Sequence, residues 1–147
     1  MSRLGEMRQA YDRLAQLLDQ EILNRKKSAK EMERFRAILD EAFYLSGWGE
    51  FEGLVTKAVD NIIAENIRSN TVEYHAWRHL KDSGRNFTVS KRLDLIFHEN
   101  STMRENLRKD YILRNTIAHD NARLPKEGVD ISVWLGTLDG LVEKFNR

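Results

Sequence analysis

The chain has 147 residues and nearly balanced charge, 24 Lys and Arg against 23 Asp and Glu, which predicts one domain over residues 1–147 and excludes a global basic field. A nucleic-acid partner would therefore have to be attracted by a local patch. There is no cysteine, no apolar run near the roughly 20 residues of a membrane span and no signal peptide, so we expect a cytoplasmic protein without disulfides, thiolate metal sites or membrane contact.

The first half of the chain predicts two long amphipathic helices. Apolar residues step by three and four over residues 4–22 and again over residues 32–67, which is the helical period. Ser28 followed by Glu31 has the spacing of a capping box and predicts the start of the second helix. Because Gly47 and Gly49 interrupt that helix, we expect either a break there or one long, bent helix.

Glycines recur in pairs on the predicted helices. Gly49 and Gly53 are four residues apart, as are Gly136 and Gly140. A glycine inside a helix costs about 0.5–1 kcal/mol relative to alanine. We therefore expect these glycines to let a neighbouring helix approach closely.

The second half of the chain predicts two short helices followed by two longer ones. They are expected over residues 72–80, around residues 93–97, from an N-cap at Ser101 to about His119, and from 131 to 145 with Asp130 as the N-cap. No strand pattern or internal repeat is evident. The fold class is therefore all-α, an up-and-down bundle of four main helices plus one or two short ones.

Arg114 breaks the pattern of the helix that follows Ser101. At about 100° per residue, it falls in the middle of an apolar stripe formed by Met103, Leu107, Tyr111 and Ala118. A guanidinium aimed at a core is costly unless it is paired or hydrogen-bonded. Such a break in the pattern points either to function or to a buried carboxylate partner, for which Glu50 and Glu52 are candidates.

His119 follows Arg114 by five residues, which separates the two side chains by roughly 140° around a helix. For both to act on one ligand, either the helix unwinds at Ala118 and His119 or His119 faces a second copy of the chain. Asn115 lies four residues before His119, so its amide could orient the imidazole. In the alternative reading, His119 only hydrogen-bonds a helix end.

Residues 114–119, Arg-Asn-Thr-Ile-Ala-His, resemble the signature of the HEPN superfamily (higher eukaryotes and prokaryotes nucleotide-binding), an arginine, a polar residue, three residues and a histidine. The resemblance is carried most clearly by residues 101–146. It implies a homodimer whose two motifs line one cleft, acting as a metal-independent endoribonuclease without a cofactor in toxin–antitoxin or antiviral roles. Relatives that pair with a nucleotidyltransferase antitoxin have a tyrosine where this chain has Asn121.

The resemblance also implies roles for the motif residues. His119 would take the proton of an RNA 2′-hydroxyl as general base, and the same residue of a second chain would protonate the leaving 5′-oxygen. Arg114 would hold the scissile phosphate, and Asn115 would position the base. The alternative is a non-catalytic helical module that binds RNA, a nucleotide or a protein partner.

A second candidate region lies between residues 73 and 92. Its basic residues could follow an RNA backbone, although charge runs are usually solvated faces; they are Arg78, His79, Lys81 and Arg85, with Lys91 and Arg92 beyond. His75 and His79 are spaced to share a metal ion. The zinc-protease pattern places glutamate where this chain has Ala76, and no third ligand is evident, so we expect no metal.

Overall fold

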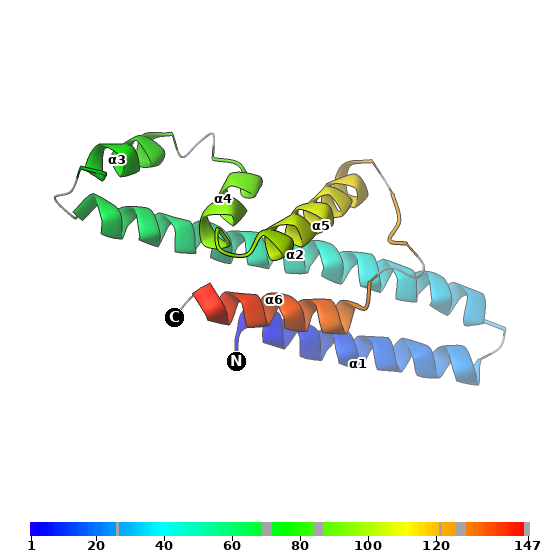
Figure 1. The fold of residues 1–147 in the computed structure, drawn as a ribbon. Helices are drawn as coiled ribbons and strands as arrows, with labels where there is room; N and C mark the ends of the chain where they lie inside the picture. The colour runs from blue at the N-terminus through cyan, green and yellow to red at the C-terminus, as the bar shows by residue number, and fades with distance from the viewer. Residues whose placement is uncertain (26, 69–71, 84–86, 121, 126–128, 146–147) are drawn as a thin grey trace.

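The computed structural model describes residues 1–25, 27–68, 72–83, 87–120, 122–125 and 129–145. Over these residues the chain forms six helices and no strand, which confirms the all-α class. The helices are α1 (Arg3–Asn24), α2 (Ala29–Arg68), α3 (Tyr74–Asp82), α4 (Val89–Ile96), α5 (Ser101–His119) and α6 (Ile131–Phe145), as Figure 1 shows.

Helix α2 is the element against which every other helix packs. Helices α1 and α6 lie along one side of it, whereas α3, α4 and α5 lie on the other (Figure 1). The four main helices, α1, α2, α5 and α6, alternate in direction. The predicted up-and-down bundle of four main helices with two short ones is therefore confirmed.

Helix α2 runs without a break through the glycines at its middle. It begins at Ala29, directly after Ser28, and continues for 40 residues, or about 60 Å at 1.5 Å per residue. Its buried side chains step by three and four along one face; they are Tyr44, Trp48, Phe51, Val55, Val59 and Ile63. Of the two alternatives for this segment, the uninterrupted helix is the one found.

The expected role of the paired glycines is wrong. A Cβ atom added at Gly49, Gly53 or Gly140 would meet nothing within 4 Å. At Gly136 it would lie 2.7 Å from Nη1 of Arg8, the far end of a flexible side chain. The four-residue spacing therefore does not mark the place where helices approach.

The close approach occurs at Gly47 instead. A Cβ atom there would lie 2.6 Å from Cζ3 of Trp134 and 2.7 Å from Cδ2 of Leu135. Both of these side chains are buried in the core and come from α6. Gly47 is thus the position at which α2 and α6 require the absence of a side chain.

Two alanine substitutions two residues apart test this difference. Gly47→Ala should lower the free energy of unfolding by about 1–3 kcal/mol, because the new methyl group overpacks the core. Gly49→Ala should instead raise it by about 0.5–1 kcal/mol, because alanine favours the helix and meets no neighbour. Urea unfolding of both variants measures the two changes in the free energy of unfolding. Changes of the same sign would contradict this packing around Gly47.

The N-caps of α5 and α6 are provided by side chains. Oδ1 of Asn100 accepts from the Met103 amide at 3.0 Å, so Asn100 caps α5 where Ser101 was predicted. Oδ1 of Asp130 accepts from the Val133 amide at 3.0 Å, which confirms the predicted cap of α6. The error at α5 is one residue, and the asparagine is the side chain in reach of the amide.

Helix α5 buries the predicted stripe over most of its length. Leu107 and Ile117 are buried, and Met103 and Tyr111 pack against the core. Ala118 is exposed, so the prediction is wrong there. In the last turn of α5, only the side that carries Ile117 is buried.

None of the helices in the described part of the chain combines the length and apolar character that a membrane crossing requires.

Candidate functional site

An aromatic cluster fixes α5 on the core just before the motif. The Tyr111 ring lies 5.6 Å from the ring of Trp48, which in turn lies 6.2 Å from that of Trp134. The Tyr44 hydroxyl donates to the carbonyl of Asp110 at 2.9 Å. Burial raises the pKa of Tyr44 to about 12, so this hydroxyl remains a donor at physiological pH.

The Arg114 guanidinium lies between Tyr111 and Asn115. Its Nη1 donates to Oδ1 of Asn115 at 2.8 Å, and its Cζ lies 5.9 Å from the centre of the Tyr111 ring. Its Nε is fully buried and has no hydrogen-bond partner. The side chain as a whole is partly buried, so its remaining donors are open to a ligand.

No carboxylate pairs with Arg114 in the described residues. The candidate partners Glu50 and Glu52 on α2 do not reach it, so that expectation is wrong. Three other partly buried arginines are paired: Arg36 with Asp19 and Asp40, and Arg104 and Arg108 with Asp94. Arg114 is therefore a partly desolvated cation that no described carboxylate neutralises.

His119 is the last residue of α5 and is exposed. The helix stays wound to this point, because the amide of Asp120 still donates to the carbonyl of Thr116 at 3.0 Å. The possibility that it unwinds at Ala118 and His119 is therefore wrong. Arg114 and His119 thus keep their separation of roughly 140° around the axis.

The side chain of Asn115 is hydrogen-bonded to Arg114 and, in the described residues, not to His119. Its Oδ1 accepts from Arg114, and within the described residues no hydrogen bond joins it to the imidazole. The expected orienting of His119 by Asn115 is therefore absent in the isolated chain. The Asn115 amide oxygen therefore orients the Arg114 guanidinium.

The exposed face of α5 that carries His119 also carries an apolar side chain. Ile112 precedes His119 by two turns, which places the two within roughly 20° of each other around the axis. Ile112 is 65% exposed. Such a face leaves open the second alternative from the sequence, in which His119 meets another copy of the chain.

Asp110 lies one turn before Arg114 and carries a partly buried carboxyl group. Burial raises its pKa, and the indole N–H of Trp134, which faces it without completing a hydrogen bond, offsets this only in part. The native state therefore holds the Asp110 proton more tightly than the unfolded chain does. The stabilisation that protonated Asp110 gives to the native state is fully present below the ordinary pKa of 3.8. It is lost as the pH rises through the raised pKa of the native state.

Asp110→Asn should remove this pH dependence. The free energy of unfolding of the variant, relative to the unchanged protein, should increase as the pH rises from below 3.8 to 7. Urea unfolding of both proteins at pH 3.5, 5 and 7 measures the change. A relative stability that falls with rising pH would show that the native state favours the ionised carboxylate.

The predicted basic RNA-binding residues lie apart from the motif. Arg78, His79 and Lys81 are exposed on α3, and Nη1 of Arg78 donates to the Tyr74 hydroxyl at 3.0 Å. Arg85 lies outside the described residues. In Figure 1, α3 lies beside the C-terminal end of α2, whereas α5 lies over the middle of α2 and its C-terminal end points away from α3, so one chain does not bring the two sets together.

The two histidines of α3 have no third metal ligand near them. Over the part of the chain that is described, no three His, Cys, Asp or Glu side chains are grouped so that they could hold a metal ion. His75 instead stacks edge-on against Tyr74, at 5.3 Å between ring centres.

No protein-family model, curated protein or solved structure matches this chain.

Proposed function

We propose that this protein is a HEPN-like, metal-independent endoribonuclease that acts on cytosolic RNA, with a toxin or antiviral-defence role. The observation that carries the proposal is the Arg114 guanidinium, which is partly buried and has no carboxylate partner among the described residues. Leaving such a cation unpaired is costly, and an anionic ligand would remove the cost. A phosphodiester fits the planar fork of arginine donors.

The chemistry requires only groups that the chain and RNA supply. His119 takes the proton of a 2′-hydroxyl, the 2′-oxygen forms a bond to phosphorus, and the bond to the 5′-oxygen breaks. The partner's His119 donates a proton to the leaving 5′-oxygen. Arg114 stabilises the charge on the phosphoryl oxygens, and Asn115 orients the Arg114 guanidinium through a hydrogen bond. The products are a 2′,3′-cyclic phosphate and a 5′-hydroxyl.

The angular separation of Arg114 and His119 supports a homodimer. Since the two side chains leave α5 on different faces, one chain does not direct both at one phosphate. A second copy docked on the Ile112–His119 face would bring two imidazoles together. The exposed Ile112 supplies apolar area for that contact.

Ile112→Glu tests the dimer and the activity together. It should convert the protein to a monomer in sedimentation analysis and reduce RNA cutting at least tenfold, because a buried unpaired carboxylate opposes association. Val133→Glu is the matched control, since Val133 is 59% exposed on α6, away from α5. An Ile112→Glu protein that remains dimeric and active would contradict the proposed interface.

The runner-up is a module that binds RNA, a nucleotide or a protein such as an antitoxin without catalysis. The observation that favours it is the absence, within the described residues, of a hydrogen bond that orients the His119 ring. Gel-shift and cutting assays on the same RNA in excess EDTA separate the two functions. Binding without cutting supports the runner-up, whereas cutting supports the nuclease.

A further inference from the structure

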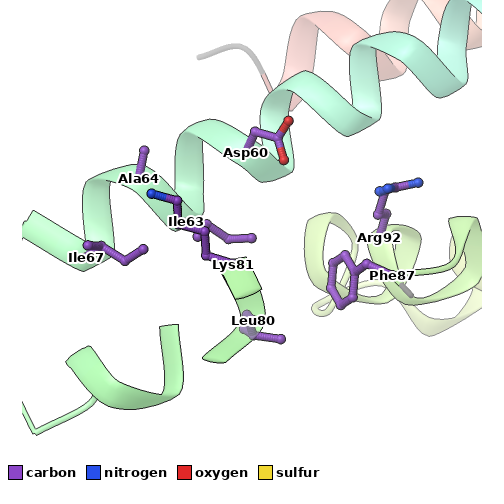
Figure 2. A pocket seen from close by; sticks show the side chains of 8 residues that line it. All are labelled: Asp60, Ile63, Ala64, Ile67, Leu80, Lys81, Phe87 and Arg92. Carbon is purple, nitrogen blue, oxygen red and sulfur yellow. The ribbon is translucent and has the colours of Figure 1, made fainter. Parts of the chain in front are cut away.

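A cavity of about 370 Å³ lies between the C-terminal half of α2, helix α3 and the start of α4 (Figure 2). Most of its lining is apolar; these residues are Ile63, Ala64, Ile67, Leu80 and Phe87. Its charged lining residues are Asp60, Lys81 and Arg92. The volume is within the range of small-molecule sites in proteins, which is roughly 300–1,000 Å³.

The charged groups of this cavity are not used by the fold. No ion pair or hydrogen bond involves the side chains of Asp60, Lys81 or Arg92 within the described residues. Arg92 is nonetheless partly buried. Like Arg114, it is a partly buried arginine without a carboxylate partner in the described residues. Two cations against one carboxylate give the cavity a net positive charge.

The lining selects among anionic ligands. None of the described lining residues carries a hydroxyl or an amide side chain. A nucleotide would bring many polar groups of its sugar and base into an apolar space without partners, at a cost for each. An anion with an apolar body avoids that cost, because only its charged head needs a partner.

We propose that this cavity binds a small amphiphilic anion, a carboxylate with a medium-length aliphatic chain. The aliphatic chain of the ligand lies against Ile63, Ile67 and Leu80, and its carboxylate lies near Arg92, while Lys81 on the other side of the cavity adds to its positive charge (Figure 2). Asp60 faces the same space from α2 and opposes an anion (Figure 2). This inference does not depend on the proposed nuclease activity, since α3 lies beside the C-terminal end of α2, whereas α5, which carries His119, lies over the middle of α2 (Figure 1).

Calorimetric titration of the full chain with hexanoate, octanoate and decanoate, each below its micellar concentration, tests the apolar contact. The affinity should rise about fourfold for each added methylene group, which corresponds to burial of that group. Affinity that does not depend on chain length would overturn the proposal, because it would indicate only attraction to surface charge. Tighter binding of adenosine monophosphate than of decanoate would overturn it as well.

Three substitutions test the charged groups with decanoate as the probe. Lys81→Ala and Arg92→Ala should each weaken binding two- to fivefold. Asp60→Asn should tighten binding, because it removes the opposing charge, whereas a ligand with an amino group would bind more weakly. Lys91→Ala is the matched control, since it removes one exposed charge from the same helix as Arg92 but does not line the cavity. Weaker binding to Asp60→Asn, or equal effects of Lys91→Ala and Arg92→Ala, would contradict the site.

Discussion

Arg114→Ala should lower the rate of RNA cutting by about 10²–10³-fold, the loss typical of removing one group that stabilises transition-state charge. The variant should fold, because in the described residues the guanidinium makes one hydrogen bond, to the neighbouring Asn115, and no ion pair. Arg114→Lys should not restore the rate, because an ammonium group lacks the planar fork of donors. Initial rates on a labelled RNA in excess EDTA measure these effects.

His119→Ala should reduce cutting by about 10²–10⁴-fold, since it removes both the base and the acid of the dimer. Lys109→Ala is the matched control for the two motif variants, because Lys109 is an exposed cation on the same helix and makes no ion pair among the described residues. It should keep nearly full activity. Full activity in a folded Arg114→Ala or His119→Ala protein would falsify the assignment of this motif as the site.

Trp48→Ala should lower the free energy of unfolding by about 3–5 kcal/mol, the range for truncation of a buried aromatic side chain. Trp48 is 0% exposed, and its ring contacts those of Phe51, Tyr111 and Trp134. The substitution therefore leaves a cavity where α2, α5 and α6 meet. Should this variant fail to fold, Trp48→Phe still tests the claim, with an intermediate loss.

Trp77→Ala is the control for this prediction, since Trp77 is only partly buried, on the short helix α3. Its loss should be clearly smaller than that of Trp48→Ala. Urea unfolding followed by circular dichroism measures all three variants. Equal losses of the free energy of unfolding for Trp48→Ala and Trp77→Ala would contradict the central place of Trp48 in the core.

The sequence predicted the helices well because their apolar periods are local properties. The errors occur where tertiary contacts decide. Gly47 meets Trp134 across the α2–α6 contact, and no spacing within α2 distinguishes it from Gly49. The α5 cap moved by one residue, because either Asn100 or Ser101 suits the position and only the backbone geometry selects between them.

The candidate site was predictable in part. Arg114 stands out in the sequence because it interrupts an apolar stripe, and the structure leaves it without a carboxylate partner in the described residues. That Asn115 would accept a hydrogen bond from Arg114 was not predictable, because the choice depends on side-chain rotamers that the sequence does not specify. Arg92 was predicted only as part of a basic stretch, since its cavity forms only where three successive helices pack together in space.

The chemical ends left on a cut RNA test the central claim most directly. We expect the protein, in excess EDTA, to leave a 2′,3′-cyclic phosphate and a 5′-hydroxyl, and we expect a single 2′-deoxy nucleotide at the cut position to block the reaction. An RNA cut only when Mg²⁺ is supplied, leaving a 3′-hydroxyl and a 5′-phosphate, would contradict a guanidinium and an imidazole acting on the sugar's own nucleophile.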